Sequence, residues 1–267
     1  MKELKKPLNE KHPKEGTPKS ETTKRERSRL GSTNQKIFRK HLIGCILFTL
    51  FFALFTYLVK NFMVDETIVS SPTGEVSAAT AVSIGFSGAN LSFRDSIGYN
   101  DTLYTITKYL GYLLFIPIVV FAFLGLYQLI TRKSFKKVNR ELKLLIPFYV
   151  AVAAVYVIFE KLIIINYRPF VIDGALESSY PSSHTLFAMC ICCSAMMVIA
   201  RLMREKHAKL AVLINLALTI LMLATVVGRL FSGVHWLTDI LGGIFISSTL
   251  LFFFATFLQH EPKSKQD

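Results

Sequence analysis

Six long apolar segments constrain the fold of this chain more than any other feature of its sequence. Each holds about 20 predominantly apolar residues, the length that a helix needs to cross the hydrocarbon core of a bilayer. The chain has 267 residues and is 52% hydrophobic, more apolar than is usual for a soluble domain. The segments cover residues 41–61, 103–130, 144–165, 185–203, 210–228 and 237–257. The sequence therefore predicts an all-α, polytopic membrane protein with six transmembrane helices.

The positive charge of the chain lies between these segments in a pattern that predicts their orientation. Of its 31 Lys and Arg residues, 25 fall in residues 1–40, 132–143, 201–209 and 263–265. With six spans, all four stretches lie on one side of the membrane, and an excess of basic residues marks the cytoplasmic side. We therefore expect both termini in the cytoplasm and a multi-pass protein of the cell membrane. The net charge of +13 then indicates a lipid bilayer as the partner, and no nucleic acid.

The remaining parts of the chain are predicted from their composition. Residues 1–40 are poor in apolar side chains, which predicts a disordered basic cytoplasmic tail that either attracts anionic headgroups or only enforces orientation. Residues 41–260 form the membrane domain, in which 62–102 is a long outer loop that lies at the interface or caps the helix ends. Residues 261–267 are expected to be a second cytoplasmic tail.

Polar side chains gather in three short motifs at the outer ends of the last four spans. The first motif is KLIIINYRP, which holds Lys161 and Arg168. Their separation is close to two helical turns, so both side chains can point the same way, and Pro169 then ends or redirects the helix. Alone, this pair is equally well explained as two snorkelling interfacial cations.

The second motif is YPSSHT, at the start of the fourth span. Either Ser182 or Ser183 is expected to cap the helix, whose free N–H groups make a site for an anion. His184 stands in the first turn, where it can titrate near neutral pH. Alone, the motif is better explained as an ordinary serine cap beside an interfacial histidine.

The third motif is GRLFSGVHWLTDILGG, which joins the fifth and sixth spans. Arg229 ends one span, a tight turn follows, and His235 opens the next. Asp239 comes four residues later and is expected on the same helix face. A carboxylate that accepts from one ring nitrogen fixes the tautomer and leaves the other nitrogen free as a nucleophile.

All three motifs fall at the same face of the membrane. Together they bring three cations, two histidines and one aspartate to one place, although a charge at bilayer depth costs roughly 2.5–3.5 kcal/mol. The three cations can clamp the oxygens of a phosphoryl group and stabilise charge that develops during its transfer. With Asp239 as the only nearby carboxylate, no cage for Mg²⁺ or Zn²⁺ is evident. The motifs therefore predict phosphoryl transfer without a metal or another cofactor.

These motifs resemble the signature of the type 2 phosphatidic acid phosphatases, K-x6-R-P, P-S-G-H and S-R-x5-H-x3-D. The resemblance covers residues from about 100 to 260 and implies a role for each matching position. His235 would attack phosphorus to give a phosphohistidine, with Asp239 orienting it, and His184 would protonate the leaving lipid alkoxide. The phosphoryl oxygens would be held by Lys161, Arg168, Arg229, the Ser182 hydroxyl and the Ser183 backbone N–H.

Two positions depart from this signature. Ser183 stands where the family has glycine, and Gly228 stands where it has serine before the arginine. Neither change removes a charged group. We therefore expect them to affect the geometry of the bound phosphate and the rate, and not the reaction class.

The interpretation is a membrane lipid phosphatase whose site faces the extracytoplasmic side. Its substrate is expected to be a lipid phosphate or a polyprenyl diphosphate. Undecaprenyl diphosphate is the first candidate, because that carrier is released on the same side, and phosphatidylglycerol phosphate and phosphatidate are the others. A lipid phosphotransferase using the same site is one alternative. A non-catalytic transporter or scaffold is another, although transporter sites usually lie near the midplane between repeated halves.

Overall fold

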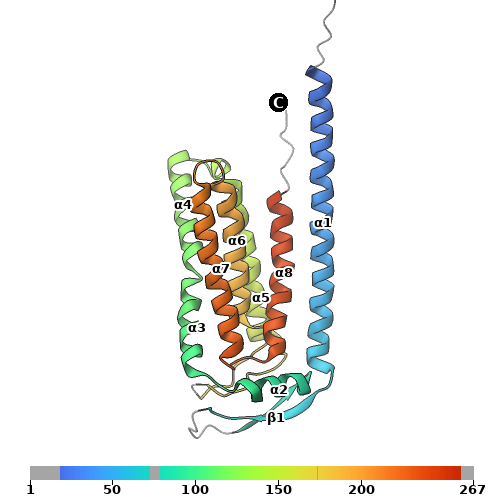
Figure 1. Cartoon of the computed structure of the whole chain (residues 1–267), viewed down its shortest axis with the longest axis vertical. Coiled ribbons are helices and arrows are strands. Elements are labelled where there is room, and N and C mark those ends of the chain that lie inside the picture. The colour runs from blue at the N-terminus through green and yellow to red at the C-terminus, as the bar shows by residue number, and fades with distance from the viewer. Residues whose placement is uncertain (1–18, 73–78, 173, 260–267) are drawn as a thin grey trace, which may run out of the picture.

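The computed structural model describes residues 19–72, 79–172 and 174–259, with the backbone alone for 19–34. Long helices stand side by side, and a short cap of strands and a helix closes one end of the bundle (Figure 1). The order of elements is α1 (Lys19–Asn61), β1 (Asp65–Val69), β2 (Thr80–Ile84), α2 (Ser87–Ile97), α3 (Asp101–Leu113), α4 (Ile116–Arg132), the 3-10 helix η1 (Phe135–Lys137), α5 (Arg140–Val157), the π-helix η2 (Ile158–Leu162), α6 (Ser183–Leu202), α7 (Ala208–Phe231) and α8 (Leu237–Gln259).

The predicted six membrane spans are confirmed by the length and composition of the helices. The spans are Gln35–Asn61, Asp101–Arg132, Arg140–Leu162, Ser183–Leu202, Ala208–Phe231 and Leu237–Gln259, with mean hydropathies from 2.0 to 2.6. The second span consists of α3 and α4, which are interrupted at 114–115 just before Pro117. This break fits the steric conflict between a proline ring and the helical turn that precedes it.

The first helix begins earlier than the sequence predicted. Residues 19–40 were expected to be disordered, but α1 runs without interruption from Lys19 to Asn61. That expectation considered only whether the segment could bury a core of its own. A helix that continues an existing span needs no core, and residues 19–40 are rich in Lys, Arg and Glu, which favour helices, and contain no proline. Residues 1–18 and 261–267 of the two expected tails lie outside the described residues.

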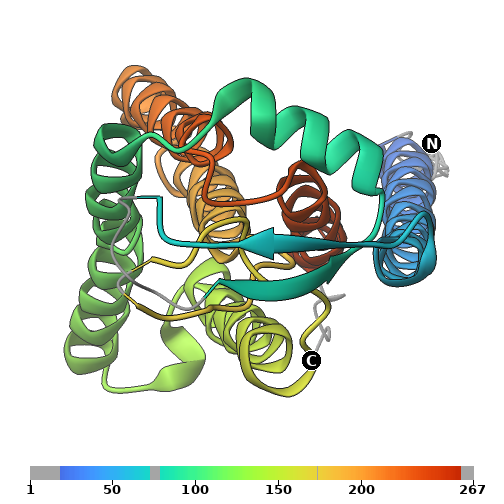
Figure 2. The same ribbon diagram turned by 90° about the horizontal axis from the view of Figure 1, so that it is seen from below.

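The long connection between the first two spans is folded and covers the end of the bundle. β1 and β2 pair in an antiparallel hairpin, with Asp65 opposite Ile84, and α2 lies beside it across the helix ends (Figure 2). Of the two roles expected for this connection, capping the helix ends is the one observed. Asn90 of α2 fastens the cap to α8, because its Nδ2 donates to Thr238 Oγ1 over 3.0 Å and its Oδ1 accepts from Thr238 N–H over 3.2 Å.

The centre of the bundle is formed by α6 and α8. Half of the residues in their most apolar windows are buried, compared with 11% for the first span. Small and medium side chains such as Ala188, Cys190 and Ala195 allow α6 to pack closely, and all three are fully buried. The polar motifs therefore start from the ends of the two most enclosed helices, which holds them in fixed positions beneath the cap.

Candidate active site

The three predicted polar motifs meet at the capped end of the bundle. His184 lies in the first turn of α6, Arg229 in the last turn of α7, and Asp239 in the first turn of α8. His235 lies in the turn between α7 and α8, two residues before α8 begins. Gly233 makes this turn possible, because its φ of 74° is a conformation that side chains with a Cβ rarely adopt.

Ser179 lies between His235 and Asp239. Its Oγ is 3.1 Å from His235 Nδ1 and 2.5 Å from Asp239 Oδ2. The ring nitrogen and the carboxylate oxygen are themselves 3.6 Å apart, which is too long for a hydrogen bond. The expected direct contact between the imidazole and the carboxylate is therefore replaced by a serine bridge. The reason is that His235 precedes α8, so the two residues do not share a helix face.

The Asp239 carboxylate is fully buried and accepts two further hydrogen bonds. Asn166 Nδ2 donates to Oδ1 over 3.0 Å, and the Trp236 backbone N–H donates to Oδ2 over 2.8 Å. With the Ser179 hydroxyl, three donors surround the carboxylate. This number of donors stabilises its ionised form and fixes its orientation.

His235 has a free nitrogen that faces a cationic environment. It is 3% exposed, and its Nε2 has no hydrogen-bond partner. Burial lowers the pKa of His235 well below its usual value, and the nearby charges of Arg168 and Arg229 lower it further. The imidazole is therefore neutral at physiological pH, which is the state that a nitrogen nucleophile requires.

Arg229 connects the third motif to the second. It is 1% exposed, its Nη2 lies 2.6 Å from His184 Nε2, and its guanidinium lies 5.1 Å from the centre of the Tyr104 ring. Because a guanidinium can only donate, His184 Nε2 is the acceptor. Arg229 Nε and Nη1 and His184 Nδ1 have no partner in the described part of the chain, so this cluster has unused donors for a ligand.

Arg168 reaches the same cluster from an extended segment, not from a helix. The helical part of the third span ends at Leu162, and Tyr167 and Ser178 form an isolated β-bridge. Arg168 is buried, its Nη2 pairs with Glu177 Oε2 at 2.9 Å, and its Nε has no partner. Glu177 is a second carboxylate close to the site, so the expectation that Asp239 is the only one was wrong.

The predicted helical pairing of Lys161 with Arg168 was also wrong, because the helix ends between them. Lys161 is exposed in η2 and does not line the cavity at the site. Lys108 of α3 does line it. One sequence signal pointed to Lys108: it is among the few basic residues outside the cytoplasmic clusters.

A cavity of about 260 Å³ opens at this cluster and has two chemically different parts. Its polar part is formed by Lys108, Arg168, His184 and Arg229 with Ser183. Its apolar part is formed by aromatic and aliphatic side chains such as Tyr112 of α3, Phe115 of the break between α3 and α4, and Phe187 of α6. His235 is not among the lining side chains, although the two arginines that line the cavity act on it electrostatically. The cavity is thus cationic at one side and apolar at the other.

The serines of the second motif have different environments. Ser182 is the N-cap of α6, one of the two candidates, and its Oγ accepts from Thr185 N–H at 3.5 Å and from Thr185 Oγ1 at 3.2 Å. It is completely buried, whereas Ser183 is partly exposed and lines the cavity. The family glycine is thus replaced by a serine whose side chain has space.

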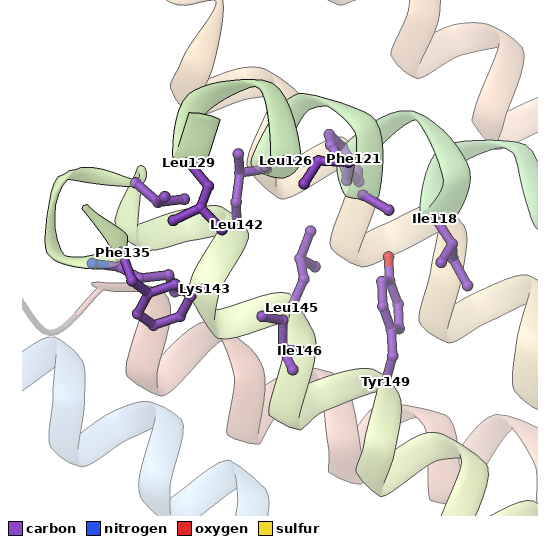
Figure 3. Close-up of a pocket in the computed structure, with 13 residues that line it drawn as sticks. Ile118, Phe121, Leu126, Leu129, Phe135, Leu142, Lys143, Leu145, Ile146 and Tyr149 are labelled. Atoms are coloured by element: carbon purple, nitrogen blue, oxygen red, sulfur yellow. The ribbon is translucent and has the colours of Figure 1, made fainter. Parts of the chain in front are cut away.

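A second cavity, of about 340 Å³, lies between α4 and α5 near η1 (Figure 3). Its walls are mainly Leu, Ile and Phe side chains, and its polar groups are the Tyr149 hydroxyl and the Lys143 amine. It holds none of the residues of the three motifs. This composition offers a mainly apolar environment with a single cation and no histidine.

Sequence reasoning missed the residues that support the predicted ones. Asn166 lies within the first motif, and Glu177 and Ser179 lie just before the second, but none has a spacing that identifies a partner. In the described residues there is no group of three or more His, Cys, Asp or Glu side chains placed to hold a metal ion. The arrangement defines a multi-pass membrane protein with a buried, cationic, histidine-containing anion site.

The comparisons with known proteins agree with this class. The family model described as the PAP2 superfamily matches residues 145–263, which include all three motifs. No curated protein matches the chain. A solved structure, the transmembrane PAP2-type phosphatidylglycerolphosphate phosphatase from Bacillus subtilis, matches with a TM-score of 0.53 at 14% identity, over 83% of this chain and 98% of that one. The resemblance to the type 2 phosphatidic acid phosphatases is therefore confirmed, in residues 145–263 by the family model and in the transmembrane fold by the structure. Together they support a membrane lipid phosphatase in general.

Proposed function

We propose that this chain hydrolyses a lipid phosphate or polyprenyl diphosphate at the extracytoplasmic face of the cell membrane, through a phosphohistidine on His235 and without a metal. The observation that carries the proposal is the convergence of His235, His184, Arg168 and Arg229, each of which has at least one buried nitrogen without a hydrogen-bond partner among the described residues. Buried polar groups are normally satisfied, so the unsatisfied donors of Arg168, His184 and Arg229, one from each motif, support an anionic ligand as the missing partner.

The first chemical step forms a bond between His235 Nε2 and phosphorus. The bond from phosphorus to the bridging oxygen breaks, and His184 gives a proton to that oxygen. For undecaprenyl diphosphate the leaving group is the lipid monophosphate. In the second step water attacks the phosphohistidine, His184 takes a proton from that water, and the electrons of the N–P bond return to His235. Free phosphate is the product.

His184 has to be released from Arg229 before it can act as an acid. In the empty site its Nε2 accepts a hydrogen bond from Arg229 Nη2 and therefore carries no proton. Phosphoryl oxygens are stronger acceptors for a guanidinium than an imidazole is. A bound phosphate would draw Arg229 away, and its negative charge would favour a proton on the freed nitrogen.

The two-part cavity supports a lipid as the substrate. The cationic part suits a phosphate headgroup, and the aromatic and aliphatic side chains of α3 and α6 offer an apolar path for the start of a lipid tail. Arg168 and Arg229 line the cavity and also act on His235. Lys108 is a third cation in the lining of the cavity. Because a diphosphate headgroup carries more oxygens and more charge than a monophosphate, we expect it to use Lys108 more, which keeps undecaprenyl diphosphate as the first candidate.

The orientation of the site is proposed from charge. The basic residues in 132–143 and 201–209 lie in or next to helix ends opposite the capped end (Figure 1), and such residues mark the cytoplasmic side. An exposed cap residue tests this: Ser96→Cys should react with a membrane-impermeant maleimide in intact spheroplasts. Labelling only after the membrane is opened would place the site in the cytoplasm.

The test of activity is phosphate release by detergent-purified protein in EDTA. The substrates are undecaprenyl diphosphate, phosphatidylglycerol phosphate and phosphatidate. We expect turnover by the wild type, none by His235→Ala, and wild-type turnover by His207→Ala, which removes an exposed histidine far from the site in sequence. Turnover that persists in His235→Ala contradicts the nucleophile, and turnover abolished by EDTA contradicts the metal-free mechanism.

The two alternatives give different results in the same assay. A lipid phosphotransferase transfers radiolabelled phosphate to an added lipid alcohol in preference to water. A transporter or scaffold releases no phosphate from any of the three lipids, although the protein is folded. The transporter has less support, because the charged groups of the site lie at one end of the bundle.

A further inference from the structure

Ser179 occupies a position that no motif assigns. It lies in the connection between η2 and α6, is 2% exposed, and contacts both His235 and Asp239 through one oxygen. Its Oγ lies 3.1 Å from the histidine nitrogen and 2.5 Å from the carboxylate oxygen, which are 3.6 Å apart from each other. The serine is therefore the hydrogen-bonded link between the two residues.

The number of protons in this link determines the tautomer of His235. A serine hydroxyl has one proton to donate and two lone pairs to accept. An ionised carboxylate can only accept, and Asp239 is held in that form by donors from Asn166 and Trp236. The Ser179 proton therefore points to Asp239, and a lone pair of its oxygen faces His235. Nδ1 of the imidazole must then carry the ring proton, and Nε2 must be unprotonated.

We propose that Ser179 is a positioning residue that sets the His235 tautomer and keeps Nε2 available as the nucleophile. The proposal rests on the proposed function, in which His235 attacks phosphorus. The serine transmits the acceptor character of Asp239 to a histidine that lies beyond hydrogen-bond distance of it. When His235 gains positive charge during attack, the Asp239 carboxylate stabilises that charge through the Ser179 hydroxyl.

Removing the hydroxyl leaves a gap that the neighbouring groups do not close. Asp239 is held by Asn166 and by the backbone of Trp236, and its own N–H bonds to Trp236 O. The carboxylate is thus fixed on several sides and cannot move toward the ring without losing these bonds. In Ser179→Ala, Nδ1 loses its side-chain acceptor and keeps only the backbone of residue 179, which also hydrogen-bonds to His235. The preference of the ring for one tautomer therefore weakens.

The experiment combines kinetics with ¹⁵N NMR of histidine-labelled protein in detergent. The His235 signals are assigned by their absence in His235→Gln. We expect an unprotonated Nε2 in the wild type and a mixture of tautomers in Ser179→Ala. We also expect kcat to fall about 10- to 100-fold with little change in KM, as outer partners of metal-ligating histidines do. Ser179→Thr, which keeps the hydroxyl, should restore the wild-type tautomer and most of kcat.

Ser194→Ala is the matched control. Ser194 is also a buried serine, and its hydroxyl bonds to Ile191 O and to Tyr149 within the bundle. It should change neither kcat nor the His235 signals. A loss of activity equal to that of Ser179→Ala would mean that any buried serine supports the fold in this way and would overturn the proposal.

The remaining outcomes separate this proposal from the proposed function. A proton on Nε2 in the wild type overturns the tautomer assignment whether or not any variant folds. An unchanged kcat and unchanged signals in Ser179→Ala overturn the positioning role. If the wild type shows the expected tautomer but releases no phosphate from any lipid, the lipid phosphatase is contradicted and the hydrogen-bond link stands.

Discussion

Replacing Asp239 by asparagine separates the charge of the carboxylate from its geometry. Asn166 Oδ1 has no partner, so the Asn166 amide can turn over and accept from the new side-chain NH2 group. The new carbonyl oxygen then remains opposite Ser179 and Trp236 and accepts from both. We therefore expect Asp239→Asn to fold and to keep the His235 tautomer, while its negative charge is lost.

The size of the effect follows from the distance between the two groups. Attack by Nε2 places a positive charge on the imidazole, 3.6 Å from Asp239 Oδ2. At an effective dielectric constant of about 20, that attraction is about 4 to 5 kcal/mol. At 1.36 kcal/mol per tenfold in rate, kcat should fall about 1,000- to 5,000-fold. In a serine-protease triad the same substitution costs about 10⁴-fold because the tautomer is wrong, whereas here the loss comes from charge.

The assay is the kcat for phosphate release by the purified variant, together with its thermal unfolding and the ¹⁵N signals of His235. Asn166→Ala is the control, because it removes one donor from the carboxylate and leaves the charge. Its kcat should fall by less than about tenfold, the lower end of what is seen when a residue that hydrogen-bonds to a functional side chain is replaced. A rate for Asp239→Asn within tenfold of the wild type would refute the electrostatic role. A switch of the ring proton to Nε2 would show that Asp239, and not Ser179, sets the tautomer.

Three further predictions test the charge state, the turn and the third cation. Because the pKa of His235 is lowered, its ¹⁵N signals should remain those of the neutral ring at pH 6. The free energy of unfolding should fall as the pH drops below about 6.5, where the unfolded chain takes up the proton first. A ring that is half protonated at pH 6.5 would contradict this. Gly233→Ala should lower the free energy of unfolding, measured by denaturant titration, by about 2 to 5 kcal/mol. The reason is that φ is 74° and the new Cβ would lie 1.9 Å from a carbonyl oxygen of the α2–α3 turn. Gly174→Ala is the control and should cost clearly less, because its φ is similar at 71° but no atom lies within 4 Å of the new Cβ. Lys108→Gln should raise the KM for a lipid diphosphate more than the KM for a lipid monophosphate. Lys161→Gln should change neither KM value. A rise in KM with Lys161→Gln and none with Lys108→Gln would assign the third cation to Lys161.

The sequence allowed the main architecture to be predicted because membrane spans depend on local composition. A helix of about 20 apolar residues satisfies its own backbone, whatever its neighbours are. The six spans and the positions of Arg229 and Asp239 in terminal turns were therefore predicted correctly, and the N-cap of α6 is Ser182, one of the two serines that the sequence offered. The helical state of residues 19–40 was not, because a helix that extends from a span follows propensity more than the ability to form a core.

The partners of the site residues depend on contacts between distant segments. Asn166 reaches Asp239 from 73 positions away, and Ser179 reaches His235 from 56. Both lie in the irregular segment between η2 and α6, whose path is set by an isolated bridge and by packing under the hairpin. No periodic pattern describes such a path. The sequence therefore indicated most of the groups that gather at the site, but not the groups that hydrogen-bond to them.

One departure from the family signature explains how α3 reaches the site. A Cβ at Gly228 would lie 2.4 Å from Thr107 Cγ2, so a serine there would push α3 away from α7. With glycine, Thr107 packs against α7 and is 1% exposed. Tyr104 and Lys108 lie within one turn of Thr107, and this close approach brings Tyr104 over Arg229 and Lys108 into the cavity.

The missing serine is thus linked to the third cation. The family position would supply a hydroxyl beside Arg229, whereas this chain supplies the Tyr104 ring over the guanidinium and an amine on the same helix. A cation over an aromatic face is stabilised by about 2 kcal/mol when it is desolvated, so Arg229 is held without the hydroxyl. The position that weakened the match to the signature is therefore the one that allows Lys108, and not Lys161, to line the cavity at the site.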